Sequence, residues 1–238
     1  MPEEDLNREK LKRIAVEGAM DWIETNYDLS RELRIGVGSG STVGYSFPKF
    51  SEYSNITAVP SSIKTRDKLV ELGVEVDELE DSDQLVFDLD GADEVDPRLN
   101  LIKGGGGCHY LEKKVAKKSD SLFIVVDQTK LVDYLGQTFP LPVEVSPKSM
   151  DSTRNTLTQY GEPSFRRSGE SLFWTDNGNV IVDVKLTERF EVEELKKLEK
   201  EINRIDGVIE NGFFVDRKAD IVFVGTEDGL KVIGDENK

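Results

Sequence analysis

Residues 33–42 read LRIGVGSGST, and this stretch decides the fold. Its first five residues are mostly apolar, which is typical of a strand buried on both faces of a parallel sheet. The strand runs directly into a turn, residues 38–42, that contains two glycines and three hydroxyl-bearing residues. Backbone N–H groups and hydroxyls in such a turn, ahead of a helix, bind phosphate well. We favour a phosphate site here over the alternative, a plain tight turn.

The turn differs from the two common glycine-rich nucleotide motifs. A dinucleotide fingerprint requires glycine where Ser41 stands, and an acidic residue at the end of the next strand, where the sequence reads PSS (60–62). A Walker loop requires a lysine before the hydroxyl residue, and none is present. The sequence therefore argues against nicotinamide cofactors. Pro48 predicts that the following helix is short or kinked.

Strand and helix patterns alternate on both sides of this stretch. A first helix is expected from about Asn7 to Glu24, because apolar residues recur there at helical spacing. Further strands are expected at 55–62, 84–93, 121–130 and 219–226, and further helices at 65–72 and 110–119. This alternation predicts the α/β class, with a parallel sheet covered by helices on both faces. We expect the last strand to return to this sheet.

The pattern changes after residues 139–147, where three prolines mark a boundary. Alternating strands follow, with an Asn-Gly turn at Asn177–Gly178, and an amphipathic helix is expected near Glu191–Arg204. We therefore predict a larger domain over 1–138 plus 213–238 and a small α+β domain over 139–212. The final residues, GDENK (234–238), are expected to form a frayed tail.

Composition excludes several classes of protein. No stretch is long and apolar enough to span a bilayer, and the charged start MPEEDLNREKLKR is not a signal peptide. The single cysteine, Cys108, excludes an internal disulfide and is typical of a reducing compartment. We therefore expect a cytoplasmic protein without a membrane partner.

The chain is strongly acidic, with 47 acidic and 31 basic residues and a formal net charge of −16. This balance argues against nucleic acid as a partner, because phosphate backbones are bound by clustered Lys and Arg. We interpret it as a halophilic-type surface, adapted to a salty cytoplasm. An ordinary acidic protein is the alternative.

Five carboxylates cluster between Asp88 and Asp96. The cluster fails the calcium-loop template, since Ala92 replaces a ligand and Asp93 replaces the glycine. The segment VFDLDG (86–91) is similar to the nucleophile motif of haloacid dehalogenase-type phosphatases, in which Asp88 would be the nucleophile and Asp90 the acid, with magnesium. That motif usually opens its domain, whereas here it closes the third strand, so we keep this reading only as an alternative.

A lysine and four glycines follow the acids. Lys103 precedes Gly104–Gly107, where the backbone can approach a ligand closely and the lysine can neutralise a developing oxyanion. Glu112, on the next helix, would by itself be interpreted as an ordinary solvent-facing glutamate. Only the lysine and glycines before it indicate a functional role. His109 and Cys108 are interpreted as incidental packed residues.

Together these motifs resemble one family. They are, in order, GVGSGST (36–42), DGADE (90–94), LIKGGGG (101–107) with LEK (111–113), VVDQTK (125–130), FPLPVEV (139–145), TDNGN (175–179) and GVIENGFF (207–214). The chain resembles the type A ribose-5-phosphate isomerases over nearly its whole length. The resemblance implies a Rossmann-like domain with a smaller α+β, ferredoxin-like domain, a homodimer or homotetramer, and no metal or organic cofactor. The implied partner is a small sugar phosphate.

The implied activity is the interconversion of D-ribose 5-phosphate and D-ribulose 5-phosphate through an enediolate, in the non-oxidative pentose phosphate pathway. By motif, Glu112 would be the catalytic base, Asp90 and Asp93 would assist ring opening, and Lys103 would face the O1 and O2 oxygens. The residues implied for the sugar-phosphate site are Ser39, Gly40, Ser41, Thr42, Lys130 and Lys12. Lys10 is the alternative to Lys12.

These residue types suit the chemistry. A carboxylate moves the proton between C1 and C2, and a fixed ammonium stabilises the charge that develops on oxygen. The phosphate is a remote handle whose binding energy positions the reacting carbons. A non-catalytic sugar-phosphate sensor is the rival hypothesis from another class; such a protein usually carries a DNA-binding helix-turn-helix, whereas one short helix precedes the first strand here.

Overall fold

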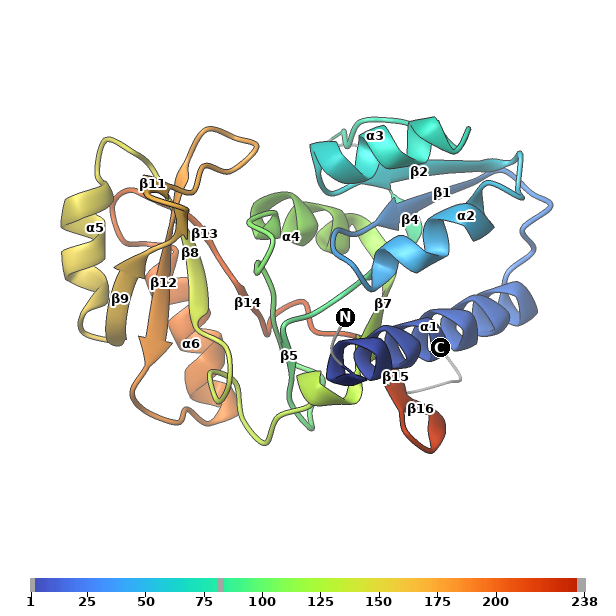
Figure 1. The fold of residues 1–238 in the computed structure, drawn as a ribbon. Helices are drawn as coiled ribbons and strands as arrows, with labels where there is room; N and C mark the ends of the chain where they lie inside the picture. The colour runs from blue at the N-terminus through green and yellow to red at the C-terminus, as the bar shows by residue number, and fades with distance from the viewer. Residues whose placement is uncertain (1–2, 81–83, 235–238) are drawn as a thin grey trace. The chain divides into compact units, whose positions relative to one another are not determined.

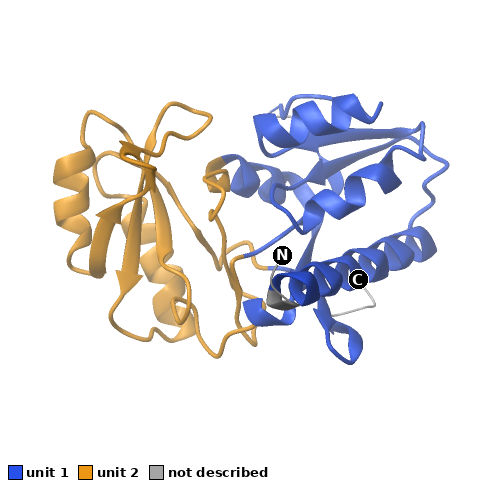
Figure 2. Cartoon of the chain, viewed as in Figure 1, with its two compact units in different colours: residues 1–92, 111–130, 219–238 blue, residues 93–110, 131–218 orange. Residues whose placement is uncertain are grey.

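The computed structural model of the chain describes residues 3–80 and 84–234. The chain forms two compact units, which Figure 2 colours separately. The first unit comprises residues 1–92, 111–130 and 219–238, and the second comprises 93–110 and 131–218. The tail predicted at 234–238 lies outside the described residues except for Gly234.

The first unit is built on a seven-stranded sheet in the order β16-β15-β7-β4-β1-β2-β3 (Figure 1). Its strands are β1 (Leu33–Val37), β2 (Ile56–Pro60), β3 (Glu75–Val76), β4 (Leu85–Asp90), β7 (Ser119–Asp127), β15 (Ile221–Thr226) and β16 (Gly229–Gly234). All neighbours pair in parallel except β15 and β16. This is the order of a doubly wound Rossmann-like sheet with one antiparallel edge strand. The predicted return of the last apolar strand is confirmed, because β15 pairs with β7.

Helices flank this sheet. They are α1 (Glu3–Asn26), α2 (Phe47–Phe50), α3 (Ile63–Glu71) and α4 (His109–Lys118), together with two 3₁₀ turns, η1 (Val43–Ser46) and η2 (Gln128–Lys130). Helix α1 packs against β15 and β7, and its apolar residues join the main core of the unit. The helix after the glycine-rich turn is short, as Pro48 predicts, since η1 and α2 span four residues each.

Alternation along β1 shows why this strand has to be apolar. Ile35 and Val37 join the core that α1 covers. Gly36 lies on the opposite side, where a Cβ atom would fall 2.5 Å from Val115 of α4 and 2.8 Å from the Asp88 carboxylate. Successive side chains of a strand point to opposite faces, so β1 is buried on both.

The second unit contains a four-stranded antiparallel sheet in the order β13-β8-β12-β9 (Figure 1). Its elements follow the chain as β8 (Leu141–Val145), α5 (Met150–Leu157), β9 (Gly161–Phe165), β12 (Val180–Leu186), α6 (Val192–Ile202) and β13 (Val208–Asn211). This β-α-β-β-α-β succession is the ferredoxin-like arrangement, which confirms the predicted α+β unit. A short hairpin, β10 (Arg167–Ser168) with β11 (Ser171–Leu172), lies between β9 and β12.

A third small sheet also belongs to the second unit. It pairs β14 (Phe213–Phe214), β6 (Leu101–Ile102) and β5 (Glu94–Val95). Because of this pairing, residues 93–110 form part of the second unit, although the sequence pattern assigns them to the larger domain. The second compact unit therefore comprises residues 93–110 and 131–218, whereas the predicted small domain comprises 139–212.

Five described strands have no counterpart in the sequence analysis: the two-residue strands β3, β5 and β6, and the longer strands β8 and β16. The proline-rich segment 139–147, interpreted only as a boundary, contains β8, which lies between β13 and β12 inside the small sheet. The Pro142 carbonyl accepts a hydrogen bond there from Gly212 N at 2.8 Å. Strand β16 escapes detection because it is an edge strand without buried residues and therefore lacks an apolar run. Among the described helices, none is long and apolar enough to cross a membrane.

Candidate active site

The carboxyl ends of β1 and β4 bring the glycine-rich turn to Asp90. The two strands pair in parallel, so the residues that follow them share one edge of the sheet. Asp90 is fully buried, and its Oδ1 atom accepts from the backbone N–H of Ser39 at 3.1 Å and of Gly91 at 2.7 Å. A Cβ atom on Gly38 would lie 1.8 Å from the same oxygen. Only glycine therefore allows the turn to approach this carboxylate.

A set of hydroxyl groups surrounds Ser39. Its Oγ atom lies 3.1 Å from Ser61 Oγ and 3.2 Å from Thr65 Oγ1. Thr65 in turn donates to the Gly38 carbonyl at 3.1 Å, and Ser62 caps α3 by accepting from Thr65 N at 3.1 Å. These hydroxyls occupy the position where a dinucleotide-binding domain carries its acid. Ser61 and Thr65 were not predicted as site residues. The signal that could have identified them is the PSS stretch (60–62), which stands at the end of the strand where a dinucleotide-binding domain has its acid.

Lys12 reaches the same turn from α1. Its ammonium donates to Ser41 Oγ at 2.9 Å and to Glu9 Oε1 at 2.6 Å. Glu9 also accepts from the hydroxyl of Tyr45, and the Arg13 guanidinium lies 4.2 Å from the centre of the Tyr45 ring. The hydrogen bond from Lys12, followed by that from Tyr45, lowers the pKa of Glu9. Lys10, the alternative to Lys12, is exposed.

Two more predicted residues belong to the first unit. Glu112 lies in the first turn of α4 and is only 4 % exposed. Lys130 ends η2, the turn that follows β7. Asp127, the buried last residue of β7, accepts from Thr129 N at 2.9 Å and from the Thr129 hydroxyl, and so orders this turn. Asp127 is a supporting residue that the sequence analysis did not single out.

In the second unit, Lys103 follows β6 and is 2 % exposed. Its backbone N–H donates to the Gly212 carbonyl at 2.9 Å. Its ammonium lies 5.5 Å from the centre of the Phe214 ring, a distance typical of a cation–π contact. A buried lysine amine beside an aromatic ring is held in one place, which suits it to stabilise a charge that appears at a defined atom.

The glycine run after Lys103 is held by Asp93. The Oδ2 atom of Asp93 accepts from Gly105 N at 2.7 Å, and a Cβ atom on Gly105 would lie 2.5 Å from Asp93 Oδ1. Within the run, Gly107 N donates to the Gly104 carbonyl at 3.0 Å. Asp93 and Lys103 therefore flank one tightly turned loop.

The other carboxylates of the acidic cluster support neighbouring backbone. Glu94 is fully buried and accepts from Gly136 N (2.5 Å), Thr138 N (2.5 Å), the Thr138 hydroxyl (2.8 Å) and Phe139 N (2.7 Å). Asp96 accepts from Arg98 N at 2.8 Å and Asn100 N at 2.9 Å, and so closes a turn. Among the described residues, no group of three or more His, Cys, Asp or Glu could hold a metal ion.

The two residues after the glycine run both contact it, but only His109 is fully buried, whereas Cys108 is partly exposed. His109 is fully buried, its Nε2 atom lies 3.3 Å from the Glu210 carbonyl, and a Cβ atom on Gly104 would lie 2.5 Å from its Nδ1 atom. Cys108 Sγ lies 3.6 Å from the Gly106 carbonyl.

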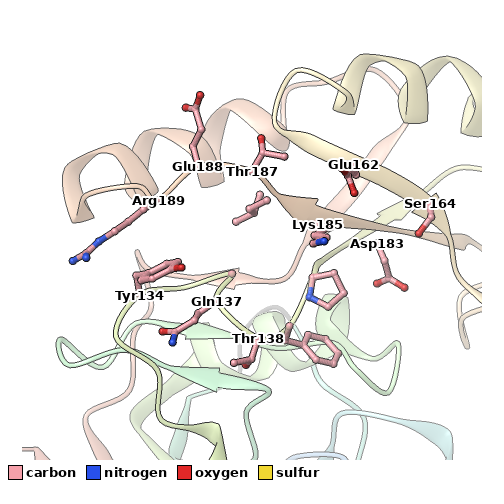
Figure 3. Close-up of a pocket in the computed structure, with 14 residues that line it drawn as sticks. Tyr134, Gln137, Thr138, Glu162, Ser164, Asp183, Lys185, Thr187, Glu188 and Arg189 are labelled. Carbon is pink, nitrogen blue, oxygen red and sulfur yellow. The ribbon is translucent and has the colours of Figure 1, made fainter.

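A cavity of about 490 Å³ lies within the second unit (Figure 3). It is lined by parts of the segment 134–140, by β9 and β12, and by residues 187–189. Its side chains carry both signs of charge, and the Arg189 guanidinium lies 5.2 Å from the centre of the Tyr134 ring. None of the predicted site residues lines this cavity.

Comparison with known proteins identifies the family. The model of ribose 5-phosphate isomerase A (phosphoriboisomerase A) matches residues 57–229. The chain is 38 % identical to ribose-5-phosphate isomerase A of Pyrococcus abyssi over 237 residues, covering 96 % of this chain and 99 % of the relative. It is also 38 % identical to the Staphylococcus aureus (strain COL) enzyme over 212 residues, covering 86 % and 91 %.

This chain belongs to the ribose 5-phosphate isomerase A family. Solved structures of the family agree with the fold. A D-ribose-5-phosphate isomerase in complex with phospho-erythronic acid superposes with a TM-score of 0.87 at 36 % identity, over 95 % of this chain and 99 % of that one. The ribose 5-phosphate isomerase A of Neisseria gonorrhoeae gives 0.84 at 36 % identity, over 95 % and 97 %. The motif-based recognition of the family is thereby confirmed.

Proposed function

We propose a role for individual residues of this chain in the reaction of the family. The chain is an aldose–ketose isomerase that interconverts D-ribose 5-phosphate and D-ribulose 5-phosphate. The observation that best supports a sugar-phosphate site is the turn 38–42, which has Lys12 bonded to Ser41 and Asp90 bonded to Ser39. A cation and several hydroxyls meet at a strand end, the usual place for phosphate in such sheets.

The phosphate end of the substrate is assigned to this turn. The backbone N–H groups and hydroxyls of Ser39, Gly40, Ser41 and Thr42 would bind the phosphate oxygens, and Lys12 would supply the positive charge. Lys130 is assigned a contact to substrate or phosphate. We infer that phospho-erythronic acid, bound in the solved relative, also binds this chain and competes with the sugar phosphate.

The proton-transfer step is assigned to Glu112. Its carboxylate would remove the proton from C2 of the open-chain aldose, giving an enediolate, and return it to C1 to form the ketose. Lys103 would stabilise the negative charge on the oxygens of C1 and C2 during this transfer. Asp90 and Asp93 would exchange protons with the ring oxygen and the hydroxyl at C1 when the furanose opens. One proton also passes from the hydroxyl at C2 to the oxygen at C1, and no oxidant or reductant is consumed.

We further propose that the enzyme needs no metal, acts in the cytoplasm and assembles as a homodimer or homotetramer. The net charge of −16 supports a halophilic-type surface, whose self-repulsion is reduced by salt. Two alternatives make different predictions: a haloacid dehalogenase-type phosphatase would require magnesium and release inorganic phosphate, and a sensor would bind the sugar phosphate without converting it.

The decisive experiment measures ribulose 5-phosphate formation from ribose 5-phosphate in excess EDTA, at low and at molar salt. Wild type should be active, and Glu112→Gln should lose about 10²- to 10⁴-fold in kcat, the usual contribution of a general base. Glu17→Gln, an exposed glutamate of α1, is the matched control and should keep the wild-type rate. A full rate for Glu112→Gln would exclude it as the base. Release of inorganic phosphate in a parallel assay, with magnesium in place of EDTA, would favour the phosphatase.

A further inference from the structure

Arg166 and Asp183 form a largely buried ion pair in the second unit. Their side chains are 12 % and 18 % exposed. The contact is bidentate, with Arg166 Nε 2.9 Å from Asp183 Oδ2 and Nη2 2.5 Å from Oδ1. Arg166 follows β9 directly, its backbone N–H donates to the Ile181 carbonyl at 2.9 Å, and Asp183 lies on the paired strand β12. The sheet therefore presents the guanidinium in one orientation, and the carboxylate holds it there.

The remaining guanidinium nitrogen is directed at the glycine run. Arg166 Nη1 donates to the Gly104 carbonyl at 2.7 Å and to the Gly105 carbonyl at 2.9 Å. Asp93 accepts from Gly105 N in the same loop. The loop is thus held through its carbonyls by Arg166 and through an N–H by Asp93.

Four consecutive glycines need such support. Glycine has the greatest backbone freedom of any residue, so a free run of four would sample many conformations. Lys103 directly precedes the first carbonyl that Arg166 binds, and its own N–H is bonded to Gly212. The backbone of Lys103 is therefore fixed on both sides, once by β-type pairing and once by the arginine.

We propose that Arg166, oriented by Asp183, is a positioning residue for the isomerisation. It holds the glycine run so that Lys103 and Asp93 are already in place when charge develops on the substrate, and it touches no substrate atom itself. The proposal rests on the role assigned to Lys103 above. Preorganised groups of this kind act mainly on the transition state, so loss of the arginine should lower kcat more than it raises KM.

The test is a double-mutant cycle of Arg166→Met and Lys103→Met, with kcat and KM measured for ribose 5-phosphate. Arg166→Met should lower kcat about 10- to 100-fold and change KM less than about threefold, as expected for a misplaced catalytic group. In the Lys103→Met background the same substitution should lower kcat less than about twofold, because both changes remove one function. Arg167→Met, an exposed neighbour, is the matched control and should behave as wild type.

The outcomes separate this inference from the proposed function. Full activity of Lys103→Met would refute the role of Lys103, whatever Arg166 does. Two results, each with a lowered kcat in Lys103→Met, would overturn the positioning role of Arg166 alone. One is an additive loss of kcat in the double variant, and the other is an unchanged kcat in folded Arg166→Met. If thermal unfolding shows that Arg166→Met is not folded, Arg166→Lys and Asp183→Asn replace it in the same cycle. Both remove part of the bidentate contact and should show the same loss of kcat and the same non-additivity.

Discussion

The Oδ1 atom of Asp90 lies 3.1 Å from the backbone nitrogen of Ser39 and accepts its hydrogen bond. A buried carboxylate at the end of β4 thus holds the first hydroxyl residue of the turn that ends β1. The aspartate assigned to the sugar end and the turn assigned to the phosphate end are therefore parts of one hydrogen-bonded structure. Disturbing the turn should disturb both.

Replacing Gly38 by alanine tests this relationship. The new Cβ atom would lie 1.8 Å from Asp90 Oδ1 and 2.5 Å from Asp90 Cβ, so the buried carboxylate has to move and lose its N–H donors. We expect Gly38→Ala to destabilise the fold by about 1–3 kcal/mol, the usual cost of overpacking, and to lower kcat. Gly44→Ala is the control, because nothing lies within 4 Å of its Cβ position. Urea unfolding and rate assays that fail to distinguish the two variants would contradict the close contact.

Lys12 should contribute to binding of the phosphate rather than to proton transfer. Loss of a charge-assisted contact costs about 1.5–3 kcal/mol, so Lys12→Met should raise KM for ribose 5-phosphate about 10- to 100-fold, with a smaller change in kcat. Lys10→Met, two residues earlier in α1 and exposed, should leave both constants near wild type. The opposite result, with KM sensitive to Lys10 alone, would assign the phosphate contact to the other lysine.

The pKa of Glu9 reports on the hydrogen bond that this carboxylate accepts from Lys12. It is lowered from its ordinary value of 4.5, first by the hydrogen bond from Lys12 and then by that from Tyr45. A lowered pKa in the folded state means that the carboxylate contributes to stability above pH 4.5, and that this contribution disappears as the pH falls through the lower, folded value. We expect the carboxyl NMR titration of Glu9 to shift upward in Lys12→Met and to stay unchanged in Lys10→Met. Identical titrations in all three proteins would show that Lys12 does not bind Glu9 in solution.

Glu94 should behave as a structural residue despite its place among the site acids. Its two oxygens accept four hydrogen bonds from Gly136, Thr138 and Phe139 while fully buried. In Glu94→Gln an amide nitrogen would face a backbone N–H, leaving buried donors unsatisfied. We expect a loss of roughly 2–4 kcal/mol in the free energy of unfolding, measured in urea at fixed salt. Glu162→Gln, an exposed glutamate of β9, is the control; equal stability of the two variants would contradict the assignment.

Local pattern was sufficient for much of the fold. The apolar runs of β1, β2, β4, β7 and β15 identify a parallel sheet, because strands buried on both faces must be apolar along their whole length. Strand β8 was missed because its prolines are the usual signal of a boundary, while its partners β12 and β13 come from 35 or more residues later in the chain. Pairing between distant segments leaves no local signal.

The same division applies to the candidate site. Sequence by itself determined the family, the turn of residues 38–42, the lysine before the glycine run and the presence of a carboxylate cluster, because each is a run of adjacent residues with its own chemistry. Only the tertiary structure separated the cluster into Asp90 at the turn, Asp93 at the glycine run and Glu94 beneath residues 136–139. It alone brought Lys12 to Ser41 and Arg166 to Gly104. The physical reason is that a carboxylate or a guanidinium takes its role from the donors and acceptors within about 3 Å, and folding rather than sequence order decides which groups these are.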